Sequence, residues 1–105
     1  MRSATPDTIR ARANLATSYY QAGRTNDAIA ILEKVVTESD AVLGAAHPDT
    51  ITARANLASS YQQAGRTKDA IALNEQVVTD REAVLGAAHP DTITAREVLD
   101  RWNAG

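Results

Sequence analysis

The sequence contains two histidines, and the first question is whether they could bind a metal ion. His47 and His89 each stand directly before a Pro-Asp pair. A histidine ligates zinc well, but a zinc site needs three or four convergent ligands. No second cluster of ligands accompanies either histidine, so we expect no metal site. Because each one precedes a helix-opening proline, we expect it to help close the turn before a helix.

Other reactive combinations are missing from the sequence. There is no Ser/His/Asp set, no glycine-rich phosphate loop, no paired carboxylates beside an apolar segment, and no cysteine. We therefore expect no enzyme activity, no cofactor and no disulfide. The net charge is −2 and the charges are spread through the chain, which predicts neither nucleic acid nor a membrane surface as a partner.

The elements that position these side chains repeat with a period of 42 residues. Residues 48–89 match residues 6–47 with ten of the 42 positions changed, and the pattern restarts at Pro90 before it diverges. A fixed period of this length indicates a stacked array of units that share one core. We expect a single repeat domain over residues 1–105, divided into repeat one (6–47), repeat two (48–89) and a partial repeat (90–105).

Each unit predicts two helices joined by a very short turn. Thr5 and Thr25 are the expected N-caps in unit one, while Gly23 and Gly44 end its helices. Short connections make the two helices antiparallel neighbours. No β pattern is visible, and the helices are expected over residues 6–22, 26–43, 48–64, 68–85 and 90–102.

Apolar residues at three- and four-residue steps predict which side of each helix is buried. The stripe of the first helix consists of Ile9, Arg12, Leu15, Ala16 and Tyr19. Where unit one has Leu32, unit two has Asn74. A buried amide without partners costs about 1–3 kcal/mol, so we expect Asn74 at a rim of the helix pair.

The spacing of Asn14-Leu15-Ala16, Tyr19, Gly23, Ala28 and Ile29, found again 42 residues later, resembles the tetratricopeptide repeat. The longer unit, with VLG before the loop and HPDT after it, is similar to the kinesin light chain type. The resemblance implies an all-α, antiparallel helix-pair solenoid that forms a right-handed superhelix. It comprises two full repeats and a C-terminal capping helix. The chain departs from the family where arginines replace large apolar residues, at Arg12, Arg54 and Arg96.

The resemblance also implies a non-catalytic scaffold that binds a protein or an extended peptide on the concave face of its first helices. By family position, the peptide-binding residues are Arg10, Asn14, Thr17, Gln21, Thr52, Asn56, Ser59 and Gln63. Asn14 and Asn56 match asparagines that hold a peptide backbone in this family, and an amide offers both donor and acceptor. The alternative for these two residues is a hydrogen bond between helices.

The two ends of the array differ. Asp100 and Asn103 make polar the side of the last helix that a further helix would cover, whereas Ala95, Val98 and Trp102 form an apolar stripe. We expect this helix to cap unit two. The first helix copies an interior repeat, so its outer face is left bare. The alternative function is therefore a self-assembling repeat fragment whose main partner is another copy, as a homodimer or swapped oligomer, or a piece of a longer array.

The start of the chain, MRSATPDT, lacks the apolar core of a signal peptide. No apolar run approaches the ~18 residues that span a bilayer. The predicted location is the cytoplasm.

Overall fold

The computed structural model describes residues 4–105, and within them it contains five helices and no strand. The predicted lead-in over residues 1–5 is described only from Ala4 onward, because residues 1–3 lie outside this range. The all-α prediction is confirmed, and each helix ends within one residue of its expected limits. The helices are α1 Pro6–Gln21, α2 Thr25–Val42, α3 Pro48–Gln63, α4 Thr67–Leu85 and α5 Pro90–Asn103.

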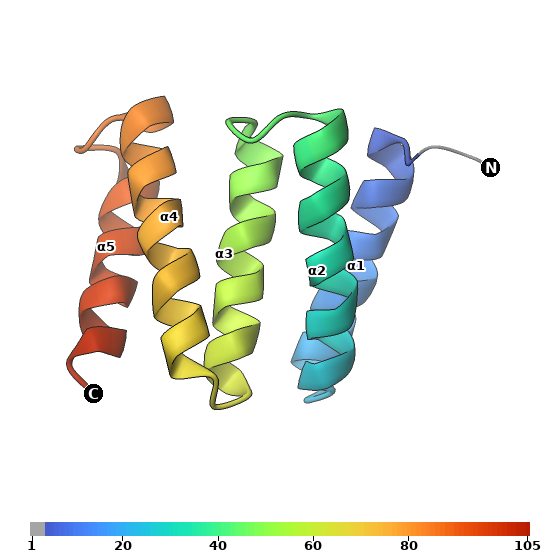
Figure 1. Ribbon diagram of the computed structural model, residues 1–105, viewed down its shortest axis with the longest axis horizontal. Coiled ribbons are helices and arrows are strands. Elements are labelled where there is room, and N and C mark those ends of the chain that lie inside the picture. Colours follow the sequence, from blue (N-terminus) through green and yellow to red (C-terminus); the bar gives the residue numbers. More distant parts are fainter. Residues whose placement is uncertain (1–3) are drawn as a thin grey trace.

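Each helix packs on the next one in the sequence, and successive helices run in opposite directions (Figure 1). The result is an elongated stack of 43 × 30 × 19 Å, with α1 at one end and α5 at the other. This is the expected helix-pair solenoid. Because contacts join neighbouring helices, the stability of such a stack is close to a sum over units and their junctions.

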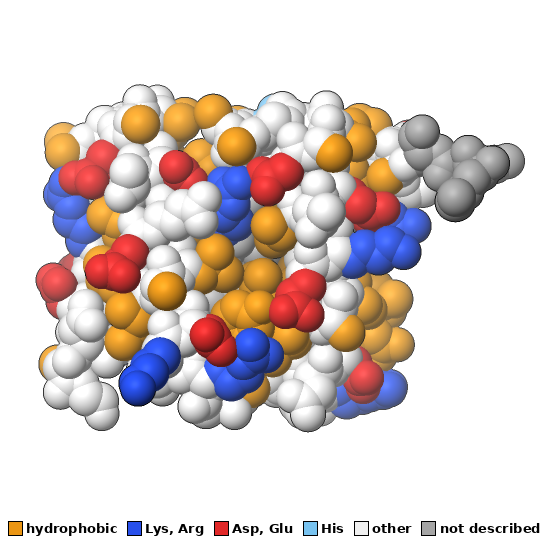
Figure 2. Space-filling view, viewed as in Figure 1, with side chains coloured by type: hydrophobic (Ala, Val, Ile, Leu, Met, Phe, Trp, Pro, Cys, Tyr) orange, Lys and Arg blue, Asp and Glu red, His pale blue; other side chains and the backbone are white. Residues whose placement is uncertain are grey.

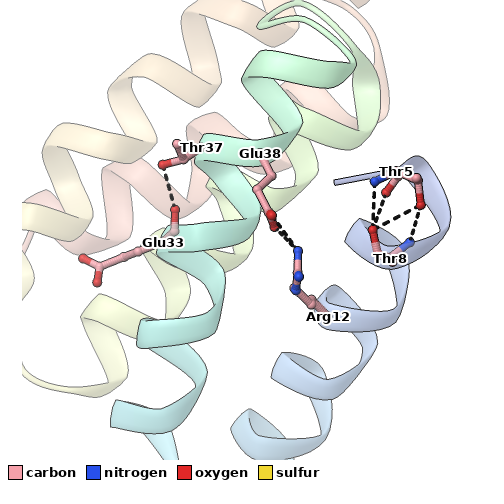
Figure 3. Close-up of polar contacts among 6 residues, drawn as sticks. All are labelled: Thr5, Thr8, Arg12, Glu33, Thr37 and Glu38. Atoms are coloured by element: carbon pink, nitrogen blue, oxygen red, sulfur yellow. Dashed lines mark hydrogen bonds and ion pairs between the residues drawn. The ribbon is translucent and has the colours of Figure 1, made fainter. Parts of the chain in front are cut away.

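Side-chain caps of two kinds begin α1, α3 and α5. At α1, Thr5 and Thr8 form a capping box in which each side chain bonds the other residue's main-chain N–H (Figure 3). At α3 and α5 the cap is a histidine: Nδ1 of His47 and of His89 accepts the N–H two residues later, at 3.0 Å. The expected role of the histidines in the turn is confirmed.

Thr25, which the sequence predicts as a cap, is instead the first residue of α2. Arg24 occupies the cap position and makes no side-chain capping bond. The Thr25 hydroxyl donates to the amide oxygen of Gln63 on α3. The prediction is wrong because this hydroxyl has a partner on the neighbouring unit.

Glycines allow the tight turns between the paired helices. Gly23 has φ +79° and Gly65 has φ +82°, a conformation that other residues rarely adopt. In both turns the next N–H bonds back to the helix, from Arg24 to the Tyr19 carbonyl and from Arg66 to the Tyr61 carbonyl, each at 2.8 Å. These bonds satisfy carbonyls that a helix end would otherwise leave free.

The core lies between successive helices, and α3 has it on both sides. Leu57 of α3 is 5% exposed and packs with Ala16, Ile29 and Leu32. Its counterpart on α1, Leu15, is 46% exposed. The prediction that Leu15 belongs to a buried stripe is therefore wrong. Leu57 is covered by α2, and within residues 4–105 no helix occupies that place beside α1.

Arginines link the units where the family usually has apolar residues. Arg54 is 4% exposed, and its guanidinium bonds Asp40 of α2, Asp80 of α4 at 3.2 Å and the Ala45 carbonyl at 3.1 Å. Its side chain therefore ties together three helices and a loop.

The other two arginines, Arg12 and Arg96, each make some of the kinds of contact that Arg54 makes. Arg12 bonds both carboxylate oxygens of Glu38 on α2, at 2.5 and 2.6 Å (Figure 3). Arg96 bonds Glu82 of α4 and the Ala87 carbonyl. All three arginines that stand in place of apolar residues therefore make ion pairs with acids of neighbouring helices.

Asn74 is not at a rim as predicted. It is 3% exposed, and its amide donates to the Ala95 carbonyl of α5 at 3.1 Å. The prediction fails because a main-chain carbonyl on the next helix supplies the partner that makes burial tolerable.

The last helix leans on unit two, as expected. Its Ala95 is buried and Leu99 packs against the cluster that contains Ile51 and Val77. Asp100 and Asn103 are exposed, as predicted for the uncovered side. Val98 and Trp102 are half-buried, so the contact with α4 follows Ala95 and Leu99 more than the predicted stripe.

Charges of both signs alternate over the face drawn in Figure 2, and hydrophobic side chains gather near its middle, where α3 lies between α2 and α4. No helix of the described chain is both long and apolar enough to cross a bilayer. Within residues 4–105, no three side chains of the His, Cys, Asp and Glu types come together where a metal ion would fit.

Candidate functional site

Three shallow hollows adjoin one another beside α1, α3 and α5. The first, of about 260 Å³, and the second, of about 300 Å³, lie between α1 and α3 over α2. The third, of about 220 Å³, lies between α3 and α5 over α4. The first two share Thr17 and Leu32, the second and third share Ser59, and Asn56 lines all three. We call this continuous surface the A-helix groove, where the A helix is the first helix of each repeat (α1, α3 and α5).

Seven of the eight predicted peptide-binding residues line the groove. The first hollow contains Arg10, Asn14, Thr17, Thr52 and Asn56. The second adds Gln21 and Ser59. Gln63 is not among the lining residues; it accepts the hydrogen bond from Thr25.

Asn14 and Asn56 occupy matching positions of the two units, and both line the first hollow. Both are exposed, and in the part of the chain that the structure describes neither side chain makes a hydrogen bond. The alternative of a bond between helices is therefore not what the geometry shows. By contrast, the hydroxyl of Thr17 already donates to the Ala13 carbonyl at 3.1 Å. The free amides of Asn14 and Asn56 face the same hollow with donors and acceptors available.

The third hollow contains a basic side chain that the sequence reasoning missed. Arg81 of α4 has 14% of its side chain exposed and lies 3.6 Å from Asp91 at the start of α5. It stands where unit one has the buried Ser39. That exchange of a small polar residue for a long cation between otherwise similar units was the available signal. Arg81 lines the third hollow, whereas Ser39 lines the first.

Charge in the groove is balanced from end to end. The first hollow has Arg10 and Asp49, the third has Arg81 and Asp91, and the second has no charged lining residue. The groove thus offers hydrogen bonds and small apolar recesses, with no concentration of one sign of charge. Such a lining suits a chain of mixed composition better than a polyanion.

The comparisons with known proteins agree with this geometry. A family model described as tetratricopeptide repeat matches residues 7–83. Two crystal structures of nearly identical TPR-like repeats, assigned to a kinesin light chain of Podosopora anserina, superimpose with TM-scores of 0.84 and 0.82. Their sequence identities to this chain are 29% and 31%. No curated protein is similar enough to count as a match.

The alignments with these structures cover 99% and 95% of this chain, and 49% and 47% of theirs. The chain therefore spans about half the length of the arrays that it resembles.

Proposed function

The chain belongs to the tetratricopeptide repeat family, in its kinesin light chain-like form, and from this premise we propose that its A-helix groove binds an extended segment of another protein. Members of the family are scaffolds for protein interactions. The finer claim, that binding occurs on this face and through these residues, is our own.

The shape of the groove favours an extended chain over a small molecule. Ligand pockets for small molecules usually enclose about 300–1,000 Å³ in one cavity. Here three hollows of about 220–300 Å³ adjoin one another, each large enough for one or two side chains. A peptide laid across them would place successive side chains in successive hollows.

The observation that carries the proposal is the position of the two free amides. Asn14 and Asn56 belong to successive units and line one hollow, and each presents a donor and an acceptor. Peptide groups recur along any extended chain, so two such amides can hold a backbone largely irrespective of its sequence. The balanced charge of the groove favours a protein segment over nucleic acid or an anionic membrane. The cytoplasmic location stays a prediction from the sequence.

Selection from a random peptide library tests the proposal. Peptides enriched on the wild-type chain should bind the Asn14→Ala, Asn56→Ala double variant about 5- to 150-fold more weakly, because each of the two lost hydrogen bonds contributes about 0.5–1.5 kcal/mol. Affinity is measured by fluorescence anisotropy with labelled peptides.

Asn26→Ala is the matched control, since Asn26 is an exposed asparagine on α2, outside the groove. It should leave affinity unchanged, and all variants should keep the helical circular dichroism of the wild type. Peptides that bind the double variant as tightly as the wild type would refute the proposed role of the groove.

A second candidate function is self-association, and one observation favours it. Leu15 leaves a large apolar side chain uncovered on the outer face of α1, where the matching Leu57 is buried. Sedimentation equilibrium of the wild type over a range of concentrations tests this: a mean mass that stays at one chain up to high micromolar concentration would exclude it.

A further inference from the structure

The outer face of α1 carries the same side chains that α3 uses to pack against α2. Thr50, Leu57 and Ser60 of α3 are all nearly or fully buried, at 0%, 5% and 0% exposure. Their counterparts on α1, which are Thr8, Leu15 and Ser18, are exposed. The α2–α3 junction therefore shows what kind of partner fits the outer face of α1: a helix with the surface of α2.

Polar contacts make that fit specific. Three polar side-chain contacts cross the α2–α3 junction: Arg54 with Asp40, Tyr61 with Glu33 at 2.6 Å, and Gln63 with Thr25. On α1 the three matching residues are Arg12, Tyr19 and Gln21. Within residues 4–105, Arg12 bonds only its own unit, at Glu38, and neither Tyr19 nor Gln21 makes a side-chain hydrogen bond. One complete half of the junction is thus present on α1 and unused.

The other half is present on α4. At the positions of Asp40, Glu33 and Thr25, α4 carries Glu82, Glu75 and Thr67. The helix that covers α4 in this structure, α5, uses only the first of them, through Arg96. It has Asn103 where α3 has Tyr61 and Gly105 where α3 has Gln63, and neither makes the corresponding contact. α5 is therefore an incomplete match to α4, whereas α1 has all three complementary residues.

The buried amide of α4 does not depend on the sequence of α5. Asn74 donates to a main-chain carbonyl, that of Ala95. The matching position on α1 is Ala11, whose carbonyl would serve equally well. Leu15 would take the place of Leu99 against the cluster that contains Val77 and Val78.

From these matched halves we infer that the occupant of the outer face of α1 is a second copy of this chain, whose α4 binds it in the place that α5 occupies in the free molecule. The inference deepens the second candidate function and rests on it. The contact is head-to-tail: the first copy keeps its own α4, and the second keeps its own α1, so the same contact can add further copies without closing a ring.

α5 competes with this assembly. It is joined to α4 by a short turn, so it meets the α4 surface at an effective concentration in the millimolar range, whereas α1 of another copy must arrive from solution. The closer match between α1 and α4 therefore leads to association mainly when the binding of α5 to α4 is weakened. α5 acts as a removable cap that holds the wild type largely in the one-chain form at low concentration.

Mixing full-length variants tests the two faces separately. Leu99→Asp weakens α5 at the α4 surface, and Leu15→Asp blocks the outer face of α1 without touching the core, because Leu15 is exposed. The double variant has an open α4 and a blocked α1. We expect it to stay a single chain by itself and to form a 1:1 complex with the wild type, which has a free α1. Sedimentation velocity measures the mass.

The single variant Leu15→Asp, mixed with the same double variant, is the control and should form no complex. The Leu99→Asp variant alone should reach a given mean mass at a concentration at least about tenfold lower than the wild type does. The inference is overturned if the double variant associates by itself, or if the control pairs as well as the wild type. It is overturned equally if the wild type forms no complex.

If the Leu99→Asp variant loses its helical circular dichroism, Arg96→Ala is used in its place, and the same complexes are expected to form or to be absent. That change removes the contacts of Arg96 with Glu82 and with the Ala87 carbonyl and leaves the apolar packing of Leu99 in place. Self-association of the wild type that Leu15→Asp leaves unchanged would preserve the second candidate function and refute this contact. The peptide test at Asn14 and Asn56 is independent of both.

Discussion

Arg54 is the side chain on which three helices converge. It is buried, and its two acidic partners, Asp40 and Asp80, belong to the helices before and after its own. Charges in such a place are stable only while each has its partner, because burial removes the water that would otherwise solvate them.

Arg54→Met should lower the free energy of unfolding by about 2–3 kcal/mol. This is below the about 3–5 kcal/mol of a fully buried pair, because both aspartates are partly exposed. Arg12→Met is the matched control: the Arg12 side chain is 36% exposed and, within residues 4–105, pairs with Glu38 alone, so its loss should cost below about 1 kcal/mol. Urea denaturation followed by circular dichroism measures both, and equal losses would contradict this role of Arg54.

Tyr61 is a second residue whose surroundings change one of its properties, here the pKa of its phenol group. Burial, and then the hydrogen bond to Glu33, raise the pKa of Tyr61 from 10.0 to about 12. The folded protein therefore keeps this phenol protonated where the unfolded chain has lost the proton. The contribution to stability is complete below pH 10 and is lost as the pH rises from about 10 through 12.

Glu33→Gln should lower the pKa of Tyr61 part of the way back toward 10.0, because the negative charge goes and the burial remains. Titration of the tyrosinate ultraviolet absorbance measures it, with Tyr61→Phe used to assign the signal. A titration curve identical to that of the wild type would show that the hydrogen bond to Glu33 has no part in the shift.

At the scale of the helix, the histidine caps decide how α3 and α5 begin. In both, a neutral ring nitrogen accepts the N–H of the aspartate two residues later. A helix start leaves its first N–H groups without main-chain partners, so a side-chain acceptor there stabilises the helix.

His47→Ala should lower the free energy of unfolding by about 0.5–2 kcal/mol, the usual cost of losing a cap. His47→Asp should retain most of the stability, because its carboxylate accepts the same N–H and also suits the helix dipole. Thermal unfolding followed by circular dichroism compares the two. If alanine and aspartate are equally destabilising, the histidine contributes by packing rather than as a cap.

For the whole molecule, the 42-residue repeat was enough to predict the architecture, because the helices and turns depend on local sequence features that recur in each unit. Prolines, glycines and the spacing of apolar residues fixed the helices, and the short turns fixed their pairing. Seven of the eight proposed groove residues line one surface for the same reason, since helix position determines which face a side chain occupies.

What the period could not predict depends on contacts between units. Leu15 and Leu57 have nearly the same local sequence, and the presence or absence of a neighbouring helix separates their exposures. Asn74 was misplaced because its partner is a main-chain carbonyl, which has no sequence signature. Thr25 was misread because its acceptor lies 38 positions away.

Arg54 pairs with one acid of the preceding unit and one of its own, and this has a consequence for how repeats can be added to the gene. A tandem duplication of one 42-codon segment supplies, in a single event, both the arginine and the acids that it meets on either side. A new junction is therefore complete in the first generation that inherits it. Later drift is tolerated where aspartate and glutamate replace one another, as they do between Asp40 and Glu82 and between Glu38 and Asp80.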